Sequence, residues 1–321
     1  MTIPAKQAVQ RGYPIALLSA AILSTSAIFV RYLTQYYHLP PIILSFWRDL
    51  FVAIVLLVIL GLVRPGLMRV TRSQLFYLII FGFVLAIFNS VWTLSVSLNG
   101  AAVGTVLAYC SAAFTALLGW WLLKECLTWV KGVAVLFCLG GCVMVAGALD
   151  PAAWSINLIG ILTGIGSGLF YAIYTLMGRS ASNRGLNPWT TLLYTFGFGA
   201  VWLLGIDLVG NGSLPGTAQG LSGLMWPEAG WQGWLILFIL AAIPTLAGFG
   251  LYNVSLSLMP SSVVNLIVTT EPAFTALWAY FLLAERFTGE QVAGSVLIVI
   301  GVVFLRLWEN KGITAKDTKE R

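Results

Sequence analysis

Long apolar stretches follow one another along the chain, separated by short runs that contain Pro, Gly, Asn or charged residues. The hydrocarbon core of a bilayer, about 30 Å thick, requires a helix of about 20 apolar residues. Ten stretches of this kind occur, at residues 13–33, 41–63, 73–97, 100–123, 128–149, 157–179, 188–210, 230–257, 261–283 and 288–308. The pattern predicts an all-α integral membrane protein with ten transmembrane helices. Because no small-residue cleavage site follows the first stretch, we expect a retained helix rather than a signal peptide.

The second half of the chain repeats the first. Residues 92–145 align with residues 252–305 at an offset of 160 without a gap. The matching positions include AFTAL at 113–117 and 273–277, Glu125 and Glu285, and Gly141 and Gly301. A copy of five helices is odd-numbered, so the two copies must cross the membrane in opposite directions. We therefore expect two inverted five-helix repeats, residues 1–150 and residues 151–321 with a tail, related by a pseudo-two-fold axis in the membrane plane.

Composition and charge agree with a membrane protein. Hydrophobic residues make up 59% of the chain and charged residues only 9%, whereas soluble domains carry about 25%. The net charge of +6 does not predict a nucleic-acid partner, because the basic residues fall in short loops and tails. With ten spans, 14 of the 17 basic residues lie on the side of the termini, and only Arg31, Arg48 and Arg286 lie elsewhere. This bias predicts a multi-pass protein of the cell (inner) membrane with both termini in the cytoplasm.

Cysteine and histidine do not indicate a metal site. Cys110, Cys126, Cys138 and Cys142 lie in or beside apolar stretches, and the single histidine, His38, is in a loop far from them. We expect small buried hydrophobic side chains, with no disulfide, metal or cofactor. The chain has no Gly-rich Lys motif of the Walker type, so ATP is not expected to drive it directly.

Short motifs in a fixed order carry a family resemblance. LKECLT at residues 123–128 returns as LAERFT at residues 283–288, and Glu271-Pro272 opens the second AFTAL segment. With the five-plus-five layout, these motifs resemble the EamA-type family of the drug/metabolite transporter superfamily over nearly the whole chain. The resemblance implies a secondary carrier, often an exporter of amino acids or other metabolites, with a central cavity between the halves. The first half departs from the pattern, with Ser111-Ala112 in place of Glu271-Pro272.

Polar and aromatic residues within the spans are the candidates for a cavity, because polar groups at membrane depth face the protein interior or water. Several recur at repeat-related positions, such as Tyr109 with Thr269 and Trp92 with Tyr252. The candidates for substrate binding are Ser26, Arg48, Asn89, Trp92, Tyr109, Tyr171, Tyr174, Tyr252, Asn253, Asn265 and Thr269. For each one, hydrogen bonding that only packs helices together is an open alternative.

Charged residues inside the spans leave two roles open. Arg48 either binds a substrate carboxylate or ties helices together. Neighbours on a helix point about 100° apart, so we do not expect Arg48 to pair directly with Asp49. Glu271 either carries a coupling proton or satisfies backbone groups freed by Pro272. Glu125 and its counterpart Glu285 are expected to be boundary or gate elements at helix ends.

These observations predict a secondary transporter, an exporter of small metabolites such as amino acids, that works by alternating access. An exporter of drugs or other lipophilic compounds is the alternative, and a channel or a membrane-embedded enzyme is a weaker one. We do not expect an enzyme, because no paired acids, histidine cluster or nucleophile arrangement lies within the spans. The expected partners are a small-molecule substrate and the bilayer, and one chain with a complete repeat can work as a monomer.

Overall fold

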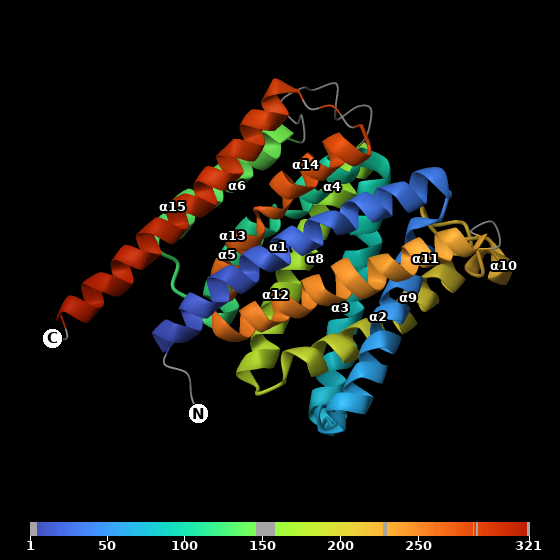
Figure 1. The fold of residues 1–321 in the computed structure, drawn as a ribbon, viewed down its shortest axis with the longest axis horizontal. Coiled ribbons are helices and arrows are strands. Elements are labelled where there is room, and N and C mark those ends of the chain that lie inside the picture. Colours follow the sequence, from blue (N-terminus) through green and yellow to red (C-terminus); the bar gives the residue numbers. More distant parts are fainter. Residues whose placement is uncertain (1–4, 146–157, 227–229, 285, 287, 320–321) are drawn as a thin grey trace.

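A computed structural model describes residues 5–145, 158–226, 230–284, 286 and 288–319. This part of the chain is helical and contains no strand. Its helices are α1 (Ala5–Tyr36), α2 (Pro41–Val63), the 3₁₀ turn η1 (Pro65–Met68), α3 (Arg72–Asn99), α4 (Ala101–Ala108), α5 (Ser111–Leu123), α6 (Trp129–Val145), α8 (Leu158–Asn183), α9 (Pro188–Gly210), α10 (Gly220–Leu224), α11 (Gly230–Leu240), the π-turn η3 (Ala241–Thr245), α12 (Leu246–Leu258), α13 (Ser261–Val268), α14 (Glu271–Leu282) and α15 (Gly289–Lys319). Figure 1 shows them packed as one bundle.

Seven segments of the described chain are long and apolar enough to cross a membrane: Val9–Tyr36, Pro41–Val63, Arg72–Asn99, Ala101–Leu123, Leu158–Asn183, Pro188–Gly210 and Gly230–Leu258. Two shorter apolar helices, Trp129–Gly141 and Gly289–Gly301, occupy the predicted fifth and tenth spans. The predicted ninth span coincides with α13 and α14, which a break separates. The chain is therefore a multi-pass helical membrane protein, and the count of ten spans stays a prediction.

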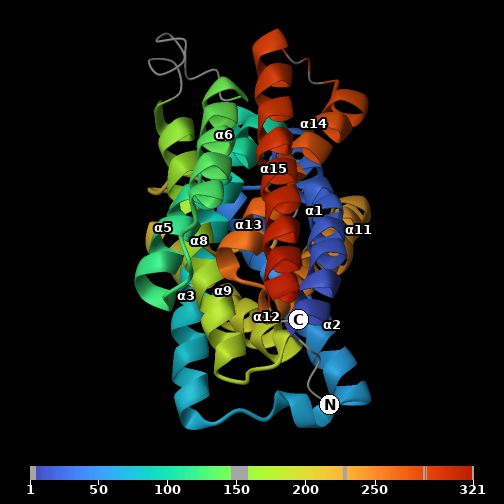
Figure 2. The same ribbon diagram turned by 90° about the vertical axis from the view of Figure 1, so that its left-hand side faces the viewer.

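One end of the bundle gathers most of the basic loops, and we call it the basic end. Tyr77 Oη near the start of α3 donates to Met177 O near the end of α8 over 2.7 Å, and Thr190 near the start of α9 donates to Leu67 O in η1, also over 2.7 Å. Lys131 Nζ at the start of α6 donates to Ser262 Oγ at the start of α13 over 2.9 Å. Figure 2 shows the α2–α3 and α8–α9 connections together at this end.

The opposite end holds the other termini of the same helices. Trp47 Nε1 near the start of α2 donates to Leu224 O in α10 over 2.7 Å. Asn99 at the end of α3 donates to Gly160 O at the start of α8 over 2.9 Å. The helix α3 and the pair α13–α14 therefore run from the basic end to the opposite end, whereas α4–α5, α8 and α11–α12 run toward the basic end.

Two of these end-to-end helices are interrupted part-way, and we call the two interrupted helices, α4–α5 and α13–α14, the broken rods. The breaks fall at residues 109–110, between α4 and α5, and at residues 269–270, between α13 and α14. The two sites are 160 positions apart, which is the offset of the sequence repeat. At each break, backbone N–H groups bond to the carbonyl three residues earlier, as in a 3₁₀ turn. Pro272 contributes to the second break, because it has no N–H to bond to a carbonyl of the preceding turn. Ala112 stands at that place in the first half, so proline is not the common cause.

Repeat-matched glycines allow α6 and α15 to approach closely along one side of the bundle (Figures 1 and 2). A Cβ atom added to Gly141 would lie 2.5 Å from Gly294 O of α15. One added to Gly301 would lie 3.1 Å from Ala134 O of α6. Each glycine therefore faces the backbone of the other helix, which explains why both halves carry it.

We predict that Gly141→Ala destabilises the protein by about 1–3 kcal/mol, because the added methyl group overpacks a backbone contact that cannot yield. Gly140→Ala is the matched control. Its Cβ would meet only the end of the Leu297 side chain, at 3.4 Å. Thermal unfolding of both variants in detergent micelles measures the difference. A melting temperature of Gly141→Ala that equals or exceeds that of Gly140→Ala would contradict this close packing of α6 and α15.

Candidate functional site

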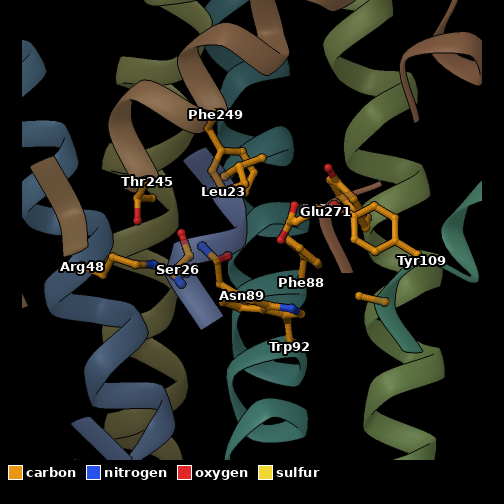
Figure 3. A pocket seen from close by; sticks show the side chains of 12 residues that line it. Leu23, Ser26, Arg48, Phe88, Asn89, Trp92, Tyr109, Thr245, Phe249 and Glu271 are labelled. Carbon is orange, nitrogen blue, oxygen red and sulfur yellow. Dashed lines mark hydrogen bonds between the residues drawn. The ribbon is translucent and has the colours of Figure 1, made fainter. Parts of the chain in front are cut away.

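A narrow cavity lies in the middle of the bundle, between elements from both halves of the chain (Figure 3). Residues of α1, α2, α3, α4, α8, η3, α12 and α14 line it: Leu23, Ser26, Arg48, Phe88, Asn89, Trp92, Ala108, Tyr109, Tyr171, Thr245, Phe249 and Glu271. The volume of the cavity is ≈ 30 Å³. One water requires roughly 10–15 Å³ on this measure, so the cavity in this conformation has room for only a few waters.

Arg48 forms one side of the cavity and pairs with its neighbour. Its Nε donates to Asp49 Oδ1 over 3.3 Å, and Asn89 Nδ2 donates to Asp49 Oδ2 over 2.7 Å. The guanidinium carbon lies 5.7 Å from the ring centroid of Trp92. The prediction that Arg48 and Asp49 do not pair was wrong. The side chains of neighbouring residues do leave the helix about 100° apart. The long side chain of Arg48 nevertheless bends so that its guanidinium group reaches the carboxylate of Asp49.

Glu271 lies on the other side, where the two helix breaks meet. Tyr109, the residue that ends α4, donates from its hydroxyl to Glu271 Oε2. Glu271 is in the first turn of α14, where the helix dipole favours a carboxylate. Ser111 Oγ, at the start of α5, also donates to Asn265 Oδ1 of α13 over 3.2 Å. Side-chain hydrogen bonds thus join the broken rods of the two halves.

Aromatic rings form much of the remaining wall. Tyr171 stacks on Phe88 with ring centroids 5.0 Å apart and an interplanar angle of 12°. On its other side Tyr171 stacks on Tyr252 at 5.6 Å. Such pairs stabilise a packed wall beyond the area that they bury. The cavity therefore combines a small number of polar groups with a rigid aromatic surface, as small-molecule sites do.

Five of the residues expected to bind substrate do not line the cavity and are buried behind the residues that do. They are Tyr174, Tyr252, Asn253, Asn265 and Thr269, all buried and absent from the lining. Asn253 Nδ2 donates to Tyr174 Oη over 2.9 Å, and the hydroxyls of Tyr252 and Thr175 are 2.6 Å apart. Seven expected residues do reach the cavity: Ser26, Arg48, Asn89, Trp92, Tyr109, Tyr171 and Glu271.

The sequence reasoning missed the apolar part of the lining. Leu23, Phe88, Ala108 and Phe249 were not candidates, because every candidate, aromatic ones included, carried a polar side-chain atom and these four carry none. Thr245 was also missed. It follows Pro244 in the π-turn η3, and a proline inside a predicted span was the available signal for an irregular, cavity-facing turn.

A second polar cluster, which we call the Glu125 clamp, lies at the basic end. Glu125, in the α5–α6 connection, accepts from the backbone N–H groups of Ser261 and Ser262 at 2.8 and 3.2 Å, and from their hydroxyls at 2.5 and 2.7 Å. Burial alone would raise the pKa of Glu125, but these hydrogen bonds outweigh it and hold the pKa below its usual value. Lys131 binds Ser262 as well. The counterpart Glu285 lies outside the described residues.

The cysteines fit their expected role only in part. Cys138 is fully buried, as a small hydrophobic side chain would be. Cys126 is exposed in the α5–α6 connection, which contradicts the expectation for that residue. Its position after the end of α5 removes it from the packed interior.

Comparison with known proteins agrees with this architecture. Residues 10–147 and 158–307 each match the EamA-like transporter family. An uncharacterized transporter of Synechocystis sp. is 26% identical over 74% of this chain and 68% of its own length. An uncharacterized inner membrane transporter of Salmonella typhimurium is 24% identical over 93% of this chain and 96% of its own. A protein of known crystal structure, 16% identical, shares the fold with a TM-score of 0.68 over 93% of this chain and 98% of its own. The two matches together cover most of the sequence, and the chain belongs to the EamA-like transporter family.

Proposed function

We propose that this membrane transporter is a secondary carrier that exports small metabolites such as amino acids by alternating access around the central cavity. The observation that carries the proposal is the meeting of both helix breaks at a buried cavity that holds a few polar side chains. Broken helices at the centre of a membrane protein supply free backbone groups and helix dipoles to a solute. One chain supplies the whole cavity, so we propose that it works as a monomer.

We further propose that the halves, residues 1–150 and 151–321, are inverted five-helix repeats that make ten spans. Support comes from the helix directions. The rod α4–α5 runs toward the basic end, whereas its counterpart α13–α14 starts there, at Ser261. Likewise α3 starts at the basic end, and α11–α12 finishes there, where Arg179 donates to Leu256 O. Inverted copies allow two equivalent packings, each open to one side of the membrane.

The charge distribution supports an inner-membrane topology with the basic end in the cytoplasm. Arg64 and Arg69 lie between α2 and α3, Arg72 begins α3, and Arg184 directly follows α8. These connections are short, and lysine and arginine in short loops favour the cytoplasmic side. On this topology both termini are cytoplasmic.

The Glu125 clamp is a candidate for the cytoplasmic gate. It ties the α5–α6 connection of the first half to the start of α13 in the second half. At the offset of 160, Ser261 and Ser262 correspond to Ala101 and Ala102, which have no hydroxyl to offer. The opposite gate therefore rests on different chemistry, and we propose that the clamp holds the cytoplasmic side closed.

Glu271 is a candidate for the coupling proton. It is 6% exposed, and the partner that binds its carboxyl group is the neutral hydroxyl of Tyr109. An ionised group at this depth is costly without a cation beside it. A proton or a cationic substrate group can supply the missing positive charge, which would link solute movement to a proton gradient.

An exporter of drugs or other lipophilic compounds, or of purines, is the second candidate. The aromatic wall favours flat, apolar solutes. A purine permease of Arabidopsis thaliana is 35% identical to this chain, although over only 26% of this chain and 24% of its own length. Substrate panels must therefore include a purine and a cationic drug.

In proteoliposomes preloaded with an unlabelled amino acid, we predict saturable uptake of the labelled form by counterflow. A panel of amino acids, sugars, adenine and cationic drugs then identifies the substrate class. Uptake that rises linearly with concentration would indicate a channel and contradict the carrier. Uptake of drugs alone would favour the second candidate.

We predict that Glu271→Gln abolishes accumulation driven by an imposed proton gradient but retains counterflow exchange, because glutamine keeps the size and loses the titrating group. Glu290→Gln, a change at an exposed acid in the first turn of α15, is the control. Uptake is measured with and without the gradient. Equal gradient stimulation in wild type and Glu271→Gln would rule out this coupling site.

We predict that Glu125→Ala opens the cavity toward the basic end at neutral pH, where the lowered pKa keeps the wild-type carboxylate ionised and bonded. A loss of about 1.5 kcal/mol of hydrogen bonding would raise the open fraction about tenfold. Labelling of Ala108→Cys, in a variant without the native cysteines, by a membrane-impermeant thiol reagent measures the opening. Glu290→Ala serves as the control, and an unchanged labelling rate in Glu125→Ala would exclude the clamp as a gate.

A further inference from the structure

Two hydrogen-bond donors on the cavity wall have no partner among the described residues. They are Nη2 of Arg48 and Oγ of Ser26. Arg48 is 2% exposed and Ser26 is 5% exposed, and both line the cavity. Buried polar atoms are satisfied in most proteins, so two unsatisfied donors that face one cavity indicate a site where a ligand can bind.

Ser26 differs from the hydroxyl residues that precede it on α1. Ser24 Oγ donates to Ala21 O over 2.7 Å, and Thr25 Oγ1 donates to Ile22 O over 2.8 Å. A hydroxyl within a membrane helix ordinarily bonds back to its own backbone in this way. The hydroxyl of Ser26 makes no such bond in this structure and lies on the cavity wall (Figure 3).

Arg48 is oriented by its neighbours and keeps free bonding capacity. Asp49 binds Nε, at 3.3 Å, which is long for a charge-assisted hydrogen bond. Trp92 lies against the guanidinium group, which limits its movement. Asp49 is fully buried and does not line the cavity, so it holds Arg48 from behind. The guanidinium group presents up to five N–H donors, and its fork matches a carboxylate.

We propose that Arg48 and Ser26 form the subsite that binds the carboxylate of the transported solute. The proposal rests on the function proposed above and names the chemical class of its substrate. Figure 3 places Arg48 and Glu271 on opposite sides of the cavity, with Ser26 and Asn89 between them. When the cavity widens to admit a solute, a molecule bound by its carboxylate at Arg48 would extend toward Glu271 along the aromatic wall.

The charges of the site favour a zwitterion. Arg48 and Asp49 balance each other, and when Glu271 carries a proton the site has no net charge, so a simple anion or a simple cation would add an uncompensated charge to a buried site. A solute with both a carboxylate and an ammonium group adds no net charge, and its ammonium group complements the carboxyl group of Glu271. The subsite therefore selects amino acids over amines, amides and uncharged solutes.

The test compares acids with their amides. L-phenylalanine, L-leucine and L-threonine, their C-terminal amides, and adenine compete for counterflow by the full-length protein in proteoliposomes. We expect each acid to bind at least about tenfold more tightly than its amide, because the amide loses the charge that Arg48 pairs with. Ser26→Ala should weaken the acids about tenfold and the amides by less, because a hydrogen bond to a charged carboxylate is stronger than one to a neutral amide oxygen, and the difference between acids and amides therefore narrows.

Two further variants complete the design. Ser24→Ala makes the same change two residues earlier, at a hydroxyl already bonded to its own helix, and should behave as wild type. Arg48→Lys should also reduce the preference for acids over amides. If Arg48→Lys does not fold, the acid preference measured in Ser26→Ala still tests the proposed subsite.

Each result is decisive. Transport of acids and amides with equal affinity, or an acid preference that Ser26→Ala leaves intact, overturns the subsite while transport stands. Transport of adenine alone also overturns the subsite and favours the second candidate function. Absence of transport for the whole panel overturns the amino-acid exporter and the subsite together.

Discussion

The structure depends on one constraint, which is that the interior of a bilayer offers no water to polar groups. Each buried N–H, C=O or hydroxyl must find its partner inside the protein. Most hydroxyls in this bundle bond back to their own helix, as Thr105 does to Ala101 O over 2.7 Å. Others bond across helices, as Ser45 does to Thr93 over 2.8 Å. Helices that satisfy their own backbone need few such bonds, and polar chemistry can therefore be concentrated at one place.

That place is where two helices are broken. A break leaves carbonyl and N–H groups without the usual partners, and polar side chains gather around them. Tyr109 and Glu271, one from each broken rod, form a hydrogen bond across the interface between the halves. The same constraint thus places the cavity, the breaks and the contact between the halves together. The chain belongs to the EamA-like transporter family, and the interface between its halves is the route that we propose for the solute.

The sequence predicted the arrangement of helices better than the depth of individual side chains. Repeat matching explained why Gly141 and Gly301 both meet a partner backbone. Periodicity placed Tyr171 and Tyr174 on one face of α8, yet only Tyr171 lines the cavity, and the hydroxyl of Tyr174 instead accepts a hydrogen bond from Asn253 of α12. Helix periodicity predicts the direction in which a side chain points. Whether that side chain reaches the cavity depends on how the neighbouring helices pack around it. The first break also lacked a proline, so the sequence carried no local signal for it.

Divergence between the halves has an energetic consequence. Ser261 and Ser262 give the Glu125 clamp four hydrogen bonds, whereas their counterparts Ala101 and Ala102 provide no hydroxyl. If the two halves exchange packings as proposed, the two end states are held by unequal contacts and differ in free energy. A difference of about 1.4 kcal/mol changes the ratio of two states tenfold. A carrier built from two inverted repeats can therefore favour one of its two end states. Which end state is favoured depends on positions where the two halves differ in sequence, such as Ser261 and Ala101.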